Sequence, residues 1–372
     1  MINDTKSKKE LIIMAPMGYT GYGVVSWQIA KHLHKNQIKV HAHPITAQKL
    51  LGNQVPRLDT QEDINLLANM MFDIYDSKSP CLKIYHQFEL ETRIGTGEYF
   101  AFPFFELDTF NAIEKFNLNI PDELIVSCEW AKNIILDNGI DKNIHVVPMG
   151  VDTDIFDQKL NTVKTDEDPY VFIMIGKWEI RKGYDLLLDL FNSAFNEKDN
   201  VELWLLGSSD TNCFSQKEID EWHSFYLSDN NKLKNKTKIF PRLPTQLDVA
   251  KTISMADCGL FISRAEGWNL ELLEVMAMNK PVITTNYSAH TEFCHKDNAY
   301  LVNIDSTEKA FDGKWFNGQG NWAKIGSNQI EQTIEHMRYV YKNKIRSNKL
   351  GVLTSQKYSW QNTANALIEC IL

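Results

Sequence analysis

Residues 263–283 of the chain read SRAEGWNLELLEVMAMNKPVI, and they give the strongest indication of its fold. A buried strand is expected to end at Ile262, a loop carries Glu266 and Gly267, and a helix is expected to begin near Asn269, a good N-cap residue. In a doubly wound parallel sheet, ligands bind beyond the carboxyl ends of the strands, where a helix start offers N–H groups and a positive dipole end to a diphosphate. The stretch therefore predicts an α/β fold with a phosphate site in its second half.

Strands and helices alternate in both halves of the chain, which is the pattern of βα units in a parallel sheet. In the first half, strands are expected over residues 11–14, 39–43, 83–86, 123–127 and 145–147, and a helix over 22–34. In the second half, strands are expected over 170–175, 201–206, 238–240 and 258–262, and a helix over 184–195. The polar stretch 150–169 indicates the connection between the halves. Residues 306–328, rich in glycine and aromatics, are expected to form a loop-rich excursion.

Size and composition fit a globular protein of two domains. The chain has 372 residues, of which 43% are hydrophobic and 23% charged, and its net charge is −9. That charge gives no general attraction to nucleic acid or anionic lipid, so DNA is a disfavoured partner. Six cysteines without CxxC spacing indicate reduced thiols and a cytoplasmic protein. No run of about 18 apolar residues is present, so no membrane span is expected, while peripheral membrane contact and oligomeric state stay open.

A second charged motif lies in IMIGKWEIRKGYDLLLDLF, residues 173–191. Lys177 and Lys182 follow an expected strand, and Arg181 stands beside Lys182. Cations at a strand end that faces a helix start are what a leaving diphosphate needs when no metal ion is bound. We therefore expect these side chains to bind phosphate, with Arg181 assisting Lys177.

Both motifs resemble those of GT4-type retaining glycosyltransferases of the GT-B fold. Residues 263–283 are similar to the EX7E signature of that family, and residues 173–191 are similar to its G-R-x-x-x-x-K-G-x-D-x-L-L pattern. The chain departs from these patterns at five positions: it has Lys177 for Arg, Trp268 for Phe, Asn269 for Gly, Val275 for Ala and Asn279 for Gly. The Asn269 side chain is expected to stand beside the phosphate path. The resemblance implies two Rossmann-like doubly wound domains that face a deep interdomain cleft.

The resemblance also implies domain bounds and site residues. The acceptor-side domain would span 1–160, with a C-terminal helix over 356–372 packing back on it, and the donor-binding domain would span 161–355. Catalytic roles are implied for Glu266, His86 and Lys182. Arg242 lies in the stretch 241–263, which resembles a loop that packs on the nucleotide base. The implied donor-binding residues are Gly21, Gly23, Lys177, Arg181, Lys182, Arg242, Trp268, Asn269, Leu270 and Glu274.

The first half carries weaker motifs. APMGYTGYGVVS, residues 15–26, approximates a dinucleotide fingerprint, but the next strand ends in HAHPI without an acidic residue for a ribose, which disfavours an NAD-dependent dehydrogenase. Asp152 and Asp154 form a DxD, which the resemblance assigns to the entry of the connecting stretch, so no metal site is expected. Glu106 and Asp108, inside GEYFAFPFFELDTF, are acceptor-side candidates; the phenylalanines around them are interpreted either as an acceptor platform or as core.

The sequence thus predicts transfer of a sugar from a UDP-, GDP- or ADP-sugar to a hydroxyl acceptor, with no divalent metal and no cofactor beyond this co-substrate. The acceptor stays open between a polysaccharide or lipopolysaccharide sugar, a small metabolite, a protein and a hydroxylated DNA base. Two alternatives remain for the activity. One is an inactive nucleotide-sugar-binding scaffold, and the other is a phosphorylase-like or epimerase-like enzyme of the same fold.

Overall fold

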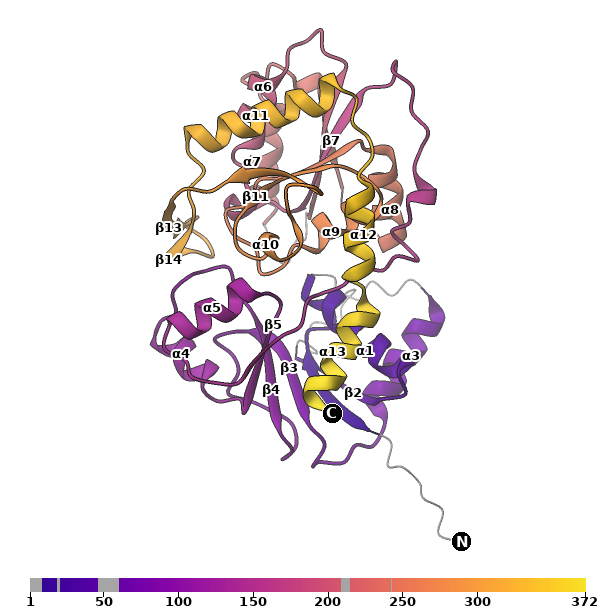
Figure 1. The fold of residues 1–372 in the computed structure, drawn as a ribbon, viewed down its shortest axis with the longest axis vertical. Coiled ribbons are helices and arrows are strands. Elements are labelled where there is room, and N and C mark those ends of the chain that lie inside the picture. Colours follow the sequence, from indigo (N-terminus) through magenta and orange to yellow (C-terminus); the bar gives the residue numbers. More distant parts are fainter. Residues whose placement is uncertain (1–8, 19–20, 46–59, 209–214, 242) are drawn as a thin grey trace. The chain divides into compact units, whose positions relative to one another are not determined.

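Two six-stranded parallel sheets form the framework of the protein in a computed structural model, which describes residues 9–18, 21–45, 60–208, 215–241 and 243–372. The chain divides into two units, which are shown in Figure 1. Unit 1 comprises Met1–Phe105, Phe110–Gly150 and Tyr358–Leu372. Unit 2 comprises Glu106–Thr109 and Val151–Lys357.

The sheet of unit 1 has the order β2-β1-β3-β4-β5-β6, and all of its neighbouring strands are parallel. Its strands are β1 (Glu10–Ala15), β2 (Lys39–Pro44), β3 (Cys81–His86), β4 (Tyr99–Phe104), β5 (Glu123–Val126) and β6 (Ile144–Val146). The helices α1, α3 and α13 gather on one flank of the unit, and α4 and α5 on the other (Figure 1). Their bounds are α1 (Gly21–Lys35), α3 (Gln61–Phe72), α4 (Ala112–Leu118), α5 (Glu129–Asp137) and α13 (Trp360–Ile371).

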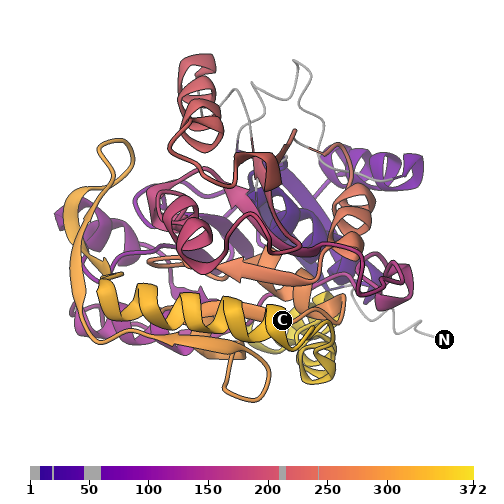
Figure 2. The same ribbon diagram turned by 90° about the horizontal axis from the view of Figure 1, so that it is seen from above.

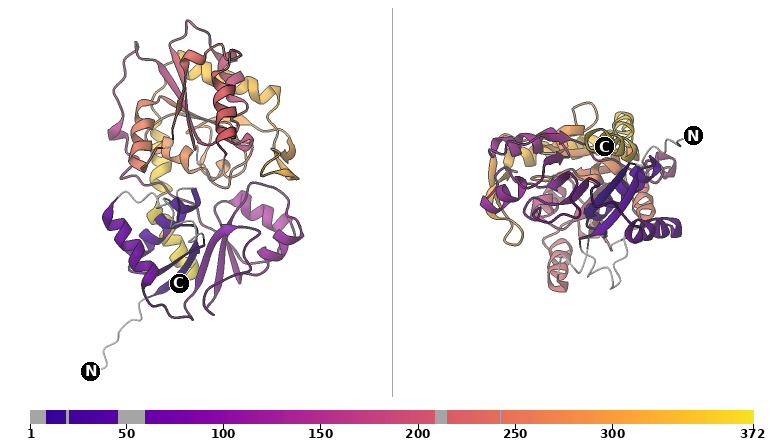
Figure 3. Two further views of the ribbon diagram at one scale, coloured as in Figure 1. Left: turned by 180° about the vertical axis from the view of Figure 1, so that it is seen from behind. Right: turned by 90° about the horizontal axis from the view of Figure 1, so that it is seen from below.

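The sheet of unit 2 has the order β12-β11-β10-β7-β8-β9 and is also parallel (Figure 3 shows both sheets from further directions). Its strands are β7 (Tyr170–Lys177), β8 (Val201–Ser208), β9 (Thr237–Phe240), β10 (Cys258–Phe261), β11 (Val282–Asn286) and β12 (Tyr300–Asn303). The helices α11 and α7 lie on opposite sides of this unit (Figure 2). Its helices are α6 (Leu187–Ala194), α7 (Gln216–Leu227), α8 (Gln246–Met255), α9 (Leu270–Ala277), α10 (His290–Phe293), α11 (Ser327–Lys342) and α12 (Lys349–Lys357).

The strands that the sequence predicts are present, with ends shifted by a residue or two, but β4, β11 and β12 were not predicted as strands. The segment that contains β4 carries five phenylalanines, and four of them, Phe100, Phe102, Phe105 and Phe110, are at most 4% exposed. This favours the core interpretation of the segment. The helix expected from Tyr184 begins only at Leu187, because a turn that ends at Gly183, with φ +82°, comes first.

Residues 306–328 are not the expected loop-rich excursion. They contain an antiparallel hairpin of β13 (Thr307–Phe311) and β14 (Asn317–Ala323). Ala310 and Trp322 of this hairpin form a small core with Leu107 and Ala265, and this buried apolar surface holds the hairpin against unit 2.

The boundaries of the units also differ from those expected. The polar stretch before β7 is bonded to unit 2. Its 3-10 turn η1 (Gln158–Leu160) contacts α8, and Asn161 Nδ2 donates to the Met278 carbonyl at 2.7 Å. The change of unit therefore falls after Gly150, where residue 160 was expected, and after Lys357, where 355 was expected. In unit 1, α13 is bonded to the end of α1, where Gln361 donates to Asn36 at 2.9 Å.

Gly150 is a sensitive point of unit 1. A Cβ atom added at Gly150 would lie 2.1 Å from the backbone nitrogen of Trp360, the first residue of α13. We predict that Gly150→Ala lowers the free energy of unfolding in urea by about 2–4 kcal/mol, the range for strongly misfitting substitutions. Gly326→Ala is the matched control, since its Cβ would meet a side-chain atom at 3.5 Å. Equal stability of the two variants would contradict the close packing at Gly150.

Candidate functional site

The candidate site of unit 2 lies at the carboxyl ends of β7 and β10, which are adjacent parallel strands. After β7 the chain makes a 3-10 turn, η2 (Ile180–Lys182), and after β10 it continues as a loop to the start of α9. Two glycines make the first turn compact. A Cβ on Gly176 would lie 2.8 Å from the Lys182 side chain, and one on Gly183 would lie 2.2 Å from the Ile262 carbonyl oxygen. These glycines allow the turn after β7 to pack against the loop after β10.

Glu266 is the central carboxylate of this site, and it is 4% exposed. Its two oxygens accept hydrogen bonds from Arg181 Nη1 at 2.7 Å, Lys182 Nζ at 3.0 Å and Ser263 Oγ at 2.8 Å. Burial alone would raise the pKa of Glu266, but Arg181 and Lys182 outweigh burial and hold the pKa well below its usual range. Glu266 is therefore ionised at neutral pH.

Arg181 is surrounded by carboxylates. Besides Glu266, its guanidinium contacts Glu179 at 2.9 Å and Glu106 at 3.8 Å, and it donates to the Ala265 carbonyl at 2.8 Å. Burial opposes its charge, yet the carboxylates, Glu266 first, raise the pKa of Arg181. Most of its donors are thus used within the protein, which suits a residue that organises carboxylates.

The two lysines differ in exposure. Lys182 is 6% exposed and also lies 3.9 Å from Glu271 in the first turn of α9. Burial opposes the charge of Lys182, but Glu266 and then Glu271 raise its pKa. The side chain of Lys177 is 37% exposed and has a long contact of 3.9 Å with Glu179. Lys177 is thus the cation of this group most accessible to a ligand from solvent.

The loop after β10 ends in the N-cap of α9. Asn269 has a left-handed backbone conformation, with φ +84°, which asparagine and glycine adopt more readily than other residues. Its side chain accepts the Leu272 N–H at 3.2 Å. Leu270 is the first residue of α9, and Glu274 lies further along this helix and is 7% exposed. Trp268 is 4% exposed and packs on Phe293 with ring centroids 4.9 Å apart. Arg242 lies outside the described residues.

The acceptor-side candidates Glu106 and Asp108 belong to unit 2. Asp108 accepts hydrogen bonds from the backbone N–H of Asn321 at 2.7 Å and from its side chain at 3.0 Å, so it fixes this segment to β14. Glu106 keeps 29% of its side chain exposed beside Arg181. Burial raises the pKa of Glu106 and Arg181 opposes the increase. Of the three carboxylates around Arg181, Glu106 is the most exposed and the least tightly bound.

The remaining candidates lie in unit 1. His86 ends β3, and its Nδ1 lies 3.0 Å from the hydroxyl of Tyr22, while its ring stacks on Phe88 at 5.0 Å. Gly23 lies in the first turn of α1, where a Cβ would meet the Gly18 carbonyl oxygen at 1.8 Å. Gly21 begins α1 and has nothing within 4 Å of the corresponding position.

Sequence reasoning missed Glu179, Tyr22 and Ser288. Glu179 stands between Lys177 and Arg181 in the printed sequence, and a carboxylate between two predicted phosphate ligands was a usable signal. Tyr22 lies inside the quoted glycine loop, but its bond to His86 joins residues 64 positions apart. Ser288 accepts the backbone N–H of Glu266 at 2.8 Å, and no pattern in the sequence connects these residues.

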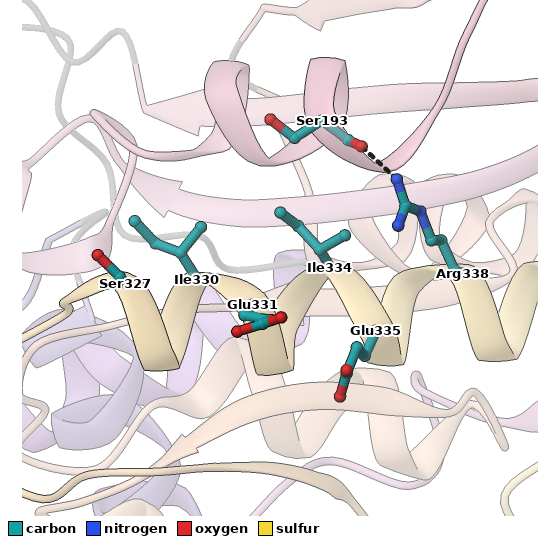
Figure 4. A pocket seen from close by; sticks show the side chains of 7 residues that line it. All are labelled: Ser193, Ser327, Ile330, Glu331, Ile334, Glu335 and Arg338. Atoms are coloured by element: carbon teal, nitrogen blue, oxygen red, sulfur yellow. Dashed lines mark hydrogen bonds between the residues drawn. The ribbon is translucent and has the colours of Figure 1, made fainter.

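Three further features of the described residues bear on the site. A pocket between α6 and α11 involves none of the candidate residues, and its Arg338 is bonded to the carbonyl of Ser193 (Figure 4). No group of three or more His, Cys, Asp or Glu side chains that could hold a metal ion is found in the described part of the chain. No described helix is long and apolar enough to cross a membrane.

Comparison with solved structures defines the class of fold. Sucrose-phosphate synthase from Thermosynechococcus elongatus matches with a TM-score of 0.68 at 14% identity, over 97% of this chain and 98% of that one. Anabaena HepE in complex with UDP and glucose matches with a TM-score of 0.63 at 12% identity, over 97% of this chain and 99% of that one. With two parallel six-stranded sheets, the chain has the GT-B fold of these glycosyltransferase structures.

Sequence comparison finds related glycosyltransferases. Residues 156–313 match the family model of group 1 glycosyl transferases. An MMP α-(1→4)-mannosyltransferase from Mycolicibacterium hassiacum is 26% identical over 223 residues, which are 58% of this chain. The match covers 50% of that protein, so the chain spans about half the length of the curated relative. The chain therefore has the GT-B fold, and residues 156–313 within it are similar to the group 1 glycosyl transferases.

The packing of carboxylates around Arg181 predicts a large stability effect. Arg181→Met leaves Glu179 and Glu266 buried without their shared cation, so we expect the free energy of unfolding in urea at pH 7 to fall by about 3–5 kcal/mol. Lys159→Met is the control, since Lys159 is an exposed partner of Asp157, and its loss should leave stability nearly unchanged. A small loss for both variants would show that Arg181 does not balance the carboxylates.

Proposed function

We propose that the protein transfers a sugar from a nucleotide-diphosphate donor to a hydroxyl acceptor, with retention at the anomeric carbon and without a divalent metal. The observation that carries the proposal is the buried group of Arg181, Lys182 and Glu266 beside the start of α9. Cations and helix N–H groups can neutralise the charge that develops on a leaving diphosphate. One relative is a mannosyltransferase, and one structurally similar protein was solved in complex with UDP and glucose, which favours hexosyl donors.

In this proposal the cations have different roles. Lys177 and Lys182 bind the diphosphate, and Arg181 chiefly holds Glu266 in place, since its donors are engaged with Glu266, Glu179 and Ala265. The ionised Glu266 stabilises positive charge at the sugar or orients one of its hydroxyls. Glu274 binds the ribose, while Trp268 and Asn269 shape the loop that leads to it.

The reaction breaks the bond between the anomeric carbon and the diphosphate oxygen and forms a glycosidic bond on the same face of the sugar. The leaving phosphate oxygen takes the proton of the acceptor hydroxyl, so no separate base is required. Glu106 orients this hydroxyl, because it is the most exposed carboxylate beside Arg181. His86 of unit 1 is assigned to the donor sugar by its place at the end of β3.

A donor screen followed by a turnover assay tests the proposal. Among UDP, GDP, ADP and their glucose and mannose sugars, one nucleotide should raise the melting temperature, since it binds the folded state. Its sugar should then release nucleoside diphosphate equally well with and without EDTA. We predict that Lys182→Met lowers this rate about 10²–10³-fold, the usual effect of removing one transition-state donor, whereas Lys159→Met leaves it unchanged. A requirement for Mg²⁺ in turnover would overturn the proposal.

The role of Glu106 is tested separately. With an acceptor identified, Glu106→Gln should slow transfer about tenfold or more, because the amide no longer accepts strongly from the hydroxyl. Binding of the nucleoside diphosphate should change less than about twofold, since Glu106 is assigned to the acceptor. Asp108→Asn is the companion variant, because it alters the same segment through Asn321. Equal loss of donor binding and of transfer in Glu106→Gln would place Glu106 on the donor instead.

A further inference from the structure

The N-cap residue of α9 needs a hydrogen-bond acceptor for its side chain, and a glycine at the same position would not need one. Asn269 carries a side-chain amide, which is 5% exposed in a left-handed backbone conformation. Its oxygen accepts the Leu272 N–H at 3.2 Å, so its NH₂ group points the other way and must find an acceptor inside the protein. That acceptor is His290, whose Nε2 lies 2.9 Å from Asn269 Nδ2.

The surroundings of His290 determine where its proton lies. Nδ1 is 3.0 Å from the carbonyl oxygen of Thr285, which can only accept, so Nδ1 carries the hydrogen. The amide nitrogen of Asn269 can only donate, so Nε2 is the unprotonated acceptor. His290 is 1% exposed, and Thr284 Oγ1 adds a contact to Nδ1 at 2.9 Å. Both ring nitrogens are therefore satisfied only in the neutral Nδ1–H form.

We propose that His290 is a positioning residue for the donor site, which holds the Asn269 amide in the one orientation that caps α9 and directs the helix start at the diphosphate. The inference rests on the proposed function. With Asn269 Oδ1 occupied by Leu272, the N–H groups of Leu270 and Glu271 are assigned to the phosphate. A reversed amide would place its NH₂ group against the Leu272 N–H and open this end of the helix.

The charge state of His290 is coupled to this orientation. Burial lowers the pKa of His290 to about 4, although Glu266 opposes the decrease and Lys182 and Arg181 reinforce it. Protonation would turn Nε2 into a donor that faces the amide donor of Asn269. Since the unfolded chain binds this proton near pH 6.5, folding stability that depends on His290 is complete above that pH and is lost as the pH falls toward 4.

A double-mutant cycle tests the proposal. Wild type, His290→Leu, Asn269→Gly and the double variant are compared for binding of the nucleoside diphosphate found in the UDP, GDP and ADP screen. Glycine adopts the left-handed conformation without an amide, so it removes the need for His290. We expect His290→Leu to weaken binding about tenfold when residue 269 is Asn and less than about threefold when it is Gly. Equal loss in both backgrounds would overturn the proposal.

Two readouts remain informative if His290→Leu does not fold or if no nucleotide binds. Nitrogen-15 spectra of histidine-labelled wild type should show one histidine in the neutral Nδ1–H form down to about pH 5, and this signal should be absent from His290→Gln. Melting temperatures of the Asn269→Gly protein should fall less than those of wild type when the pH is lowered from 6.5 to 4.5. A charged His290 at pH 6, or equal pH sensitivity of the two proteins, would overturn the proposal. The protein could show the neutral histidine signal and the expected pH dependence of its melting temperature, yet bind none of the three nucleotides. That result would reject the proposed donor and leave the Asn269–His290 pair intact.

Discussion

The carboxylate of Glu266, buried between Arg181 and Lys182, is the interaction on which the candidate site depends. An ionised carboxylate removed from water loses several kcal/mol of hydration, which only close cations and hydrogen-bond donors can offset. Arg181, Lys182 and Ser263 supply these contacts, and Ser288 fixes the backbone nitrogen of the same residue. Because both cations are themselves buried, removal of any one charge leaves the others unbalanced.

This requirement explains several features of the backbone around the site. Arg181 and Lys182 reach Glu266 only because Gly183 turns the chain beneath the Ile262 carbonyl and Gly176 leaves room for the Lys182 side chain. The loop after β10 in turn ends at a left-handed residue, Asn269, which starts α9 beside the same cations. Glycine and asparagine at these positions are thus consequences of bringing three charges together at the ends of two adjacent strands.

Most of the framework could be predicted from the sequence, because buried β-branched runs and helical periodicity are local signals. The N-cap at Asn269 and the start of α9 at Leu270 are found where the sequence places them. The hairpin of residues 307–323 could not be predicted, because most residues of its strands are glycine or polar and few side chains, such as Trp322, are buried. Its core also includes Leu107 from a distant part of the chain. The same limit applies to the site: the motifs indicate Glu266 and Lys182, whereas the contacts of Asp108 with Asn321 depend on residues 213 positions apart.

The membership of residues 106–109 in unit 2 has a consequence for how such proteins can be recombined. A chimera that joins the first 150 residues of one relative to the second half of another would carry a foreign carboxylate beside Arg181 and a foreign partner for β14. Its second half would then be incomplete even if every residue from Val151 onward were native. Exchange of the two halves between relatives should therefore succeed best when this short segment is exchanged together with the half that it contacts.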